Sequence, residues 1–134
     1  MLKSEKIEKD GKILAIVLRS AKSDNSVEFV TPKEFPLQLG MHKRKKGDYV
    51  KAHEHFPFDE LKNLQVQEIL FVKRGKISVG LYSGKKLFKE VIVSPDETIL
   101  INTGHYVKFI EDTELIEVKQ GPYRERDNEK KFLE

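Results

Sequence analysis

Four side chains of metal-binding types stand at informative spacings in this sequence: His53, His55, Glu68 and His105. In a β-strand, residues i and i+2 point to the same face, whereas in a helix they lie about 200° apart. Residues 49–55 show no 3.6-residue apolar period, contain strand-forming residues and are soon followed by a proline, which favours a strand. We therefore expect the imidazoles of His53 and His55 to share a face.

The stretch around these residues resembles the first sequence motif of the cupin superfamily, small β-barrels of the double-stranded jelly-roll type. That motif is a glycine, five residues, His-x-His, a gap, a glutamate, six residues and a glycine. The matching positions are Gly47, His53, His55, Glu68 and Gly75. The gap, residues 56–67, is longer than usual and is interpreted as a longer loop between the two ligand strands.

The second cupin motif normally reads Pro-x-Gly-x-x-His, and it aligns with residues 102–107. The proline is absent here, and Val107 occupies the usual histidine position. His105 precedes Val107 by two residues, so on a strand it keeps the same face and moves about 6.6 Å along the axis. The resemblance therefore implies that His53, His55, Glu68 and His105 hold one metal ion, with His105 as a displaced fourth ligand.

Such a donor set suits one divalent transition metal, namely Fe, Mn, Ni, Zn or Cu. A carboxylate on an apolar inner face is costly unless it is paired or bound to a cation. The simpler alternative is an ion pair between Glu68 and Lys51, with the histidines satisfied by water or backbone. We favour the metal because three of the four histidines of the chain fall at or near the motif positions.

Two further side chains, Tyr49 and Lys51, share the expected inward face of residues 49–55 and are candidate ligand-binding residues. Lys51 lies either at the rim with its ammonium group in water or inside the cavity as a functional cation. The basic run 42–46 is interpreted either as a solvated turn or as a clamp for an anionic small molecule. It lacks interleaved aromatic residues, so we expect no nucleic-acid partner.

The composition is that of one domain: 134 residues, with 25 basic and 22 acidic side chains that give a net charge of +3. The absence of cysteine excludes disulfides and thiolate metal sites and favours an intracellular location. The first ten residues are too charged for a secretory signal, and the longest apolar run, 13–18, is too short to span a bilayer. We expect a cytoplasmic protein without a membrane partner.

Short runs with a two-residue apolar period alternate with turn signals along the chain, and no helical pattern exceeds one or two turns. This pattern predicts an antiparallel barrel or sandwich, and with the resemblance it predicts a single all-β, cupin-type jelly-roll β-barrel. The expected barrel core is about residues 12–120, with a C-terminal tail at 121–134. The clearest hairpin joins 77–82 to 87–93 through Ser83 and Gly84. The predicted strands are 12–19, 26–30, 49–55, 66–73, 76–82, 86–93, 98–101, 105–110 and 113–119.

The resemblance leaves several activities open. It implies a metal-dependent isomerase or oxygenase in sugar or polysaccharide metabolism. The basic residues 43–46 and Lys51 favour a small anionic ligand for such a protein. One alternative is a non-catalytic small-molecule-binding or sensing cupin. Another is a metal-free sugar-nucleotide epimerase or isomerase with a histidine base and a tyrosine acid, for which Tyr49 and Tyr106 are candidates. The resemblance also implies a homodimer formed through barrel edges.

Overall fold

The computed structural model describes residues 3–20, 27–56, 58–59, 64–120 and 133. This part of the chain is all-β, and none of its segments forms a helix, so no helix capable of crossing a membrane is found there. The expected tail at 121–134 lies outside the described residues except for Leu133. The strands are β1 (Lys3–Lys9), β2 (Lys12–Ser20), β3 (Val27–Phe29), β4 (Gly40–His42), β5 (Glu68–Arg74), β6 (Ile77–Ser83), β7 (Lys86–Val93), β8 (Thr98–Ile101), β9 (His105–Phe109) and β10 (Glu114–Lys119).

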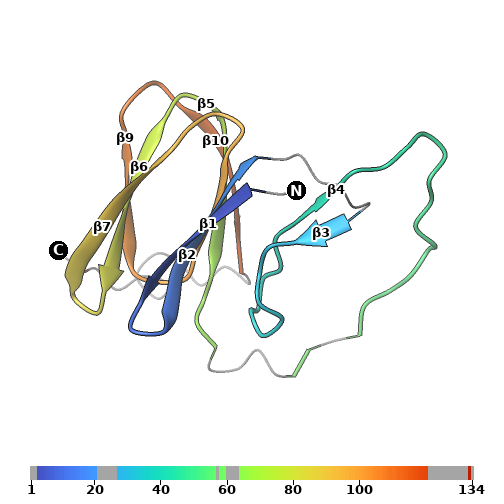
Figure 1. The fold of residues 1–134 in the computed structure, drawn as a ribbon, viewed down its shortest axis with the longest axis horizontal. Helices are drawn as coiled ribbons and strands as arrows, with labels where there is room; N and C mark the ends of the chain where they lie inside the picture. Colours follow the sequence, from blue (N-terminus) through green and yellow to red (C-terminus); the bar gives the residue numbers. More distant parts are fainter. Residues whose placement is uncertain (1–2, 21–26, 57, 60–63, 121–132, 134) are drawn as a thin grey trace.

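The strands form three antiparallel sheets. The largest has the order β1-β2-β8-β5-β10, the second has the order β7-β6-β9, and β3 pairs with β4 alone. Figure 1 shows the first two sheets as the layers of one body, with β3 and β4 beside it. The all-β, antiparallel prediction is confirmed at this level.

The hydrophobic core lies between the five-stranded and three-stranded sheets. Alternate residues of each strand face it, as the two-residue period requires. Val107 of β9 and Leu115 of β10 pack against its margin. The fully or nearly fully buried members are Ile7, Ala15, Val17, Leu70, Val72, Ile77, Val79, Leu81, Val91, Val93, Ile99 and Ile101.

The outer face of the five-stranded sheet is also covered near its middle. Leu14, Ile16 and Leu100 point away from the core cluster, yet they are 0–2% exposed. The amide of Leu37, in the segment between β3 and β4, donates a 3.0 Å hydrogen bond to the Gln67 side chain just before β5. This bond ties the β3–β4 segment to that face of the sheet.

The described sheets do not close into a barrel. β9 is an edge of the three-stranded sheet and β10 is an edge of the five-stranded sheet, so one side of the body has two edges without a described partner strand. The strand predicted over 49–55 is absent, because these residues have no regular secondary structure. A strand needs a neighbouring strand as hydrogen-bonding partner, and none of the described strands pairs with this run.

Candidate functional site

Glu68 and His105 come together at one end of the space between the two sheets. They are the first residues of β5 and β9, and the distance from His105 Nε2 to Glu68 Oε2 is 3.7 Å. Their backbone partners, Ile101 for Glu68 and Leu81 for His105, both belong to the core. The two side chains therefore face inward, as the strand parity predicts, and each is only about one fifth to one quarter exposed (21% and 24%).

The orientation of the His105 ring is fixed by its own backbone. Nδ1 lies 2.9 Å from the carbonyl oxygen of Thr103, which can only accept, so Nδ1 carries a proton and donates it. Nε2 is left facing the Glu68 carboxylate. This arrangement, with one ring nitrogen held by a carbonyl and the other presented to a charge, is usual for both metal-ligating and acid–base histidines.

The two groups shift each other's ionisation in opposite directions. Burial is the largest influence on His105 and lowers its pKa, but the contacts with Glu68 and the Thr103 carbonyl and the nearby negative charges outweigh it, so the pKa is raised from 6.5. Burial likewise tends to raise the pKa of Glu68. The contacts with His105 and Glu117 and the charges of His105 and Lys119 outweigh it, so the pKa of Glu68 falls below 4.5. The structure therefore favours a charged pair over two neutral groups.

Glu117 is a member of this cluster that the sequence did not identify. It lies on β10, two residues before Lys119, which pairs with Glu68, so it shares the Glu68 side of the sheet. Its side chain contacts Glu68. This contact is one of the influences that lower the pKa of Glu68. The cluster therefore holds an imidazole, a carboxylate and a second carboxyl group.

The pH dependence of stability is expected to reveal the Glu68–His105 pair in metal-free protein kept with a chelator. Because the pKa of His105 is raised on folding, this residue contributes its full stabilisation below about pH 6.5. That contribution is lost as the pH rises through the folded-state pKa. Because the pKa of Glu68 is lowered on folding, this residue contributes its full stabilisation above about pH 4.5. That contribution is lost as the pH falls through the folded-state pKa.

The measurement compares thermal unfolding of the wild type with His105→Gln across this range. We expect the largest difference in melting temperature between about pH 4.5 and 6.5, shrinking on both sides. Leu87→Ala, a change at a half-exposed residue that carries no ionisable group, is the control and should show no such profile. A His105→Gln difference that stayed constant from acid to alkaline pH would rule out the charged pair.

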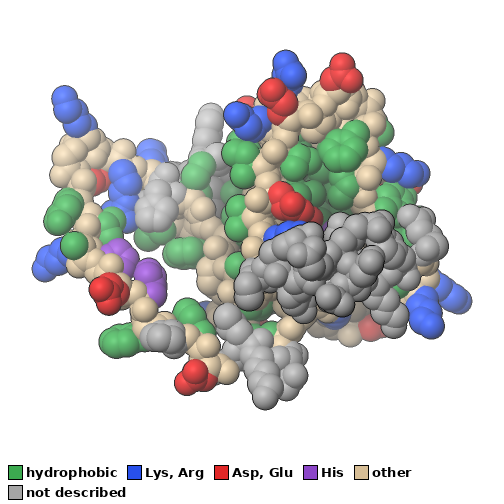
Figure 2. All heavy atoms as spheres, turned by 180° about the vertical axis from the view of Figure 1, so that it is seen from behind, with side chains coloured by type: hydrophobic (Ala, Val, Ile, Leu, Met, Phe, Trp, Pro, Cys, Tyr) green, Lys and Arg blue, Asp and Glu red, His purple; other side chains and the backbone are tan. Residues whose placement is uncertain are grey.

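His53 and His55 lie in a different part of the molecule. We call residues 43–56, 58 and 59 the arm; every one of them is exposed, and none is in a strand. The two imidazole rings are neighbours, with centroids 5.1 Å apart and planes at 70°. Figure 2 shows two histidine side chains together on this thin extension, outside the two-sheet body. The spacing thus brings these two histidines together but does not bring them to Glu68 and His105.

The His53 ring repeats the arrangement seen at His105. Its Nδ1 lies 2.7 Å from the carbonyl oxygen of Lys51, two residues earlier, just as Nδ1 of His105 contacts Thr103. Nδ1 is again the donor, and Nε2 is again available. In both halves of the predicted ligand set, therefore, a backbone carbonyl holds Nδ1 of a histidine, and Nε2 is the ring nitrogen that could bind a metal ion in place of a proton.

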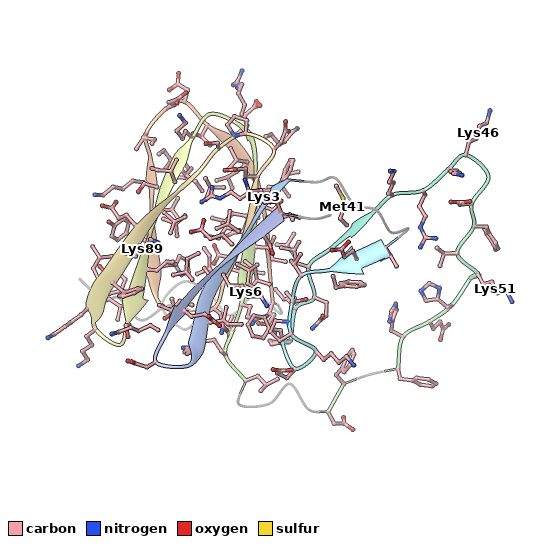
Figure 3. The ribbon with its side chains drawn as sticks, viewed as in Figure 1. Lys3, Lys6, Met41, Lys46, Lys51 and Lys89 are labelled. Carbon is pink, nitrogen blue, oxygen red and sulfur yellow. The ribbon has the colours of Figure 1, made fainter. Side chains whose placement is uncertain are left out.

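The remaining predicted ligand-binding residues are also on the arm. Tyr49 is 77% exposed, so the expectation that it faces a cavity does not hold in this structure. Lys51 is exposed as well, and Figure 3 shows it with Lys46 at the outer part of the arm. Lys45 and Asp48 close a turn by two hydrogen bonds, 3.0 Å between backbone groups and 2.8 Å from the Lys45 amide to the Asp48 carboxylate. Within the basic run, His42 therefore ends β4, and residues 43–46 are exposed and lead into this turn.

A metal site needs more donors than either pair provides. Within the described residues, no three histidine, aspartate or glutamate side chains are grouped so that they could hold a metal ion. The donor chemistry nevertheless fits: one pair supplies an imidazole and a carboxylate, the other supplies two imidazoles, and His53 and His105 are held with Nε2 available. The predicted four-ligand set is present as two halves.

A buried polar network that the sequence did not indicate stands next to the Glu68 half. Gln67 is 1% exposed, and its amide nitrogen donates a 3.1 Å hydrogen bond to the side chain of Asn102. Asn102 in turn donates to the carbonyl of Ile13 at 2.9 Å. These bonds join the starts of β2 and β5 to the end of β8, so they position the strand end that carries Glu68.

Comparison of the chain with protein-family models, with curated proteins and with solved structures finds no match in any of the three.

Proposed function

We propose that this protein is a small-molecule-binding metalloprotein of the cupin jelly-roll type. In this proposal one divalent transition metal is held by Glu68 and His105 from the sheet body together with His53 and His55 from the arm. The observation that carries the proposal is the inward-facing Glu68–His105 contact, in which the Thr103 carbonyl leaves Nε2 of the imidazole available. Carboxylate and imidazole from separate strands are the donors that Fe, Mn, Ni, Zn and Cu accept.

The bound metal would act as a Lewis acid toward an oxygen-bearing ligand. The chain's own residues have distinct tasks: the Thr103 carbonyl orients His105, and Glu117 contacts the ligating carboxylate of Glu68. The exposed cations of residues 43–46 and Lys51 would favour an anionic ligand such as a phosphorylated sugar or a nucleotide sugar. Isomerisation or oxygenation of such a ligand is the activity that we propose.

A second candidate function is supported by the same contact. The raised pKa of His105 and the carboxyl groups of Glu68 and Glu117 provide one imidazole and two carboxyl groups for metal-free acid–base catalysis. This would suit epimerisation or isomerisation of a sugar nucleotide. The two candidates differ in whether the protein contains metal at all.

Elemental analysis of protein purified without a histidine tag tests the proposal. We expect about one equivalent of a single transition metal per chain, since four protein ligands bind such ions tightly. His53→Ala should abolish tight binding, and His105→Ala should weaken it at least about tenfold. His42→Ala, outside the ligand set, is the control. Far less than half an equivalent, with no uptake on reconstitution, would reject the metal and leave the acid–base candidate.

A further inference from the structure

Gly104, the residue directly before His105, carries a side chain from a distant part of the sequence. A Cβ atom added to Gly104 would lie 2.6 Å from Cδ1 of Leu133, which is too close for two carbon atoms. Among the described residues the next nearest is Tyr82, whose Cβ would be at an ordinary contact distance of 3.7 Å. The partly buried side chain of Leu133 therefore rests against the bare Cα of this glycine.

The backbone conformation of Gly104 does not itself require a glycine, because its φ is not positive. Two other described glycines without a positive φ have the same relation to a single large side chain. The ring of Phe29 lies against Gly40, and the ring of Tyr106 lies against Gly80. In each case a residue with a Cβ would displace that side chain. The glycine at 104 therefore makes room for the leucine.

The turn against which Leu133 rests also holds the imidazole of His105. The Thr103 carbonyl accepts a 2.9 Å hydrogen bond from Nδ1 of His105. The same turn is fastened to the end of β6 by two bonds: the Tyr82 amide donates to the Gly104 carbonyl at 2.9 Å, and the Thr103 hydroxyl donates to the Tyr82 carbonyl at 2.7 Å. A displacement of Gly104 would therefore disturb the bond that orients the imidazole.

Leu133 approaches this turn from outside the space that contains the Glu68–His105 contact. Leu81 faces the core and is the backbone partner of His105. Tyr82, the next residue of β6, is not part of that core and packs edge-to-face against Tyr106, with ring centroids 6.2 Å apart. Because Tyr82 borders the space that Leu133 fills, the leucine can act on the site only through the backbone of the turn.

We infer that Leu133 is a positioning residue for His105. By resting on Gly104 it holds the turn in the conformation that presents Nε2 of His105 to Glu68. The site is therefore fully ordered only while Leu133 is docked, which couples a residue beyond β10 to the start of β9. The docking and its effect on the imidazole do not depend on the proposed function, whereas an effect on metal affinity rests on it.

A double-mutant cycle tests whether Leu133 is seated on Gly104. Leu133→Ala removes the side chain and Gly104→Ala displaces it, so each should lower the melting temperature by about 2–5 °C. The double variant should melt no lower than Leu133→Ala alone, because the backbone at 104 suits alanine once the leucine is gone. Additive losses would show that the two residues do not share this contact and would overturn the inference.

The tautomer of His105 distinguishes positioning from a contribution to stability alone. In metal-free protein at alkaline pH, ¹⁵N NMR should place the His105 proton on Nδ1, and Leu133→Ala should spread it over both ring nitrogens. Leu133→Met, which conserves volume, should keep the wild-type tautomer. His53, held by the Lys51 carbonyl in the same way, is the internal control and should not change. An unaltered His105 tautomer in folded Leu133→Ala would overturn the inference.

Titration with Co²⁺ measures the consequence for the proposed metal site. Leu133→Ala should weaken Co²⁺ binding about tenfold, as the loss of other groups that orient a ligating histidine does, and Leu133→Met should bind like the wild type. Equal affinity of Leu133→Ala and the wild type would show that docking does not reach the ligand and would overturn the inference. A wild type that binds no Co²⁺ would reject the proposed function instead, and the tautomer of His105 would then decide on the positioning role.

Discussion

Gly75→Ala is expected to destabilise the protein by about 2–5 kcal/mol, which combines the cost of a left-handed alanine with that of overpacking. Gly75 has φ 88°, a conformation that residues with a Cβ avoid. An added Cβ would also collide with the backbone carbonyl of Asp112 and with Thr113. The turn after β5 packs directly against the connection between β9 and β10, so the substitution should displace both.

Thermal or urea unfolding measures this loss, and a fall in melting temperature of roughly 10 °C is expected. Gly84→Ala is the matched control, since Gly84 also has a positive φ (62°) but has no atom within 4 Å of an added Cβ. It should show only the conformational part, about 1–2 kcal/mol. Equal losses in the two variants would contradict the steric argument.

Leu81→Ala is expected to cost about 2–5 kcal/mol, the range for truncating a large buried side chain. Leu81 is 0% exposed, belongs to the core between the two sheets and is the backbone partner of His105. A cavity at this position removes support from the strand end that carries His105. The variant should therefore lose both stability and, if metal is bound, affinity for it.

Urea denaturation compares this variant with Leu87→Ala, where the side chain is 48% exposed on β7. The control should change stability by less than about 1 kcal/mol, because the residue is already half in water. If the two variants lost similar stability, Leu81 would not be the core residue that the structure describes.

The β6–β7 hairpin shows how well the two-residue period predicts this fold. Its two strands were placed within one residue; the turn was expected at Ser83 and Gly84, whereas β6 extends to Ser83 and the turn residues are Gly84 and Lys85. A register shift between Leu81 and Tyr82 leaves Phe88 of β7 without a paired residue and changes which residues of that strand face the core, a detail that the period alone does not predict. Propensity and period together determine such local elements.

Two segments were predicted wrongly because the local sequence does not show whether a strand has a partner. β1 was missed because only Ile7 among its residues is buried, so its sequence reads as a charged segment, and pairing with β2 makes it a strand. The opposite error occurred at 49–55, where strand-like residues pair with none of the strands in the described part of the chain. Local sequence records the tendency to be extended but not the availability of a neighbour.

In the candidate site, too, the residues predicted correctly are those whose orientation follows from their own strand. The inward orientation of Glu68 and His105 followed from parity within their own strands, and the structure brings the two together. Glu117 was missed because its strand was predicted without a face being assigned to it. Gln67 and Asn102 were missed because a buried pair of amide side chains produces no sequence period. Only the fold shows that the two side chains are hydrogen-bonded to each other.

Because β8 lies in the middle of the largest sheet, that sheet cannot form completely until β8 has been synthesised. β2 pairs with β8, whose residues emerge from the ribosome some eighty residues later. Until then the β1–β2 hairpin has a free apolar edge, Ala15 to Leu18, which is open to pairing with other nascent chains. Edge-to-edge pairing of this hairpin therefore becomes blocked only when β8 has been made and takes its place beside β2.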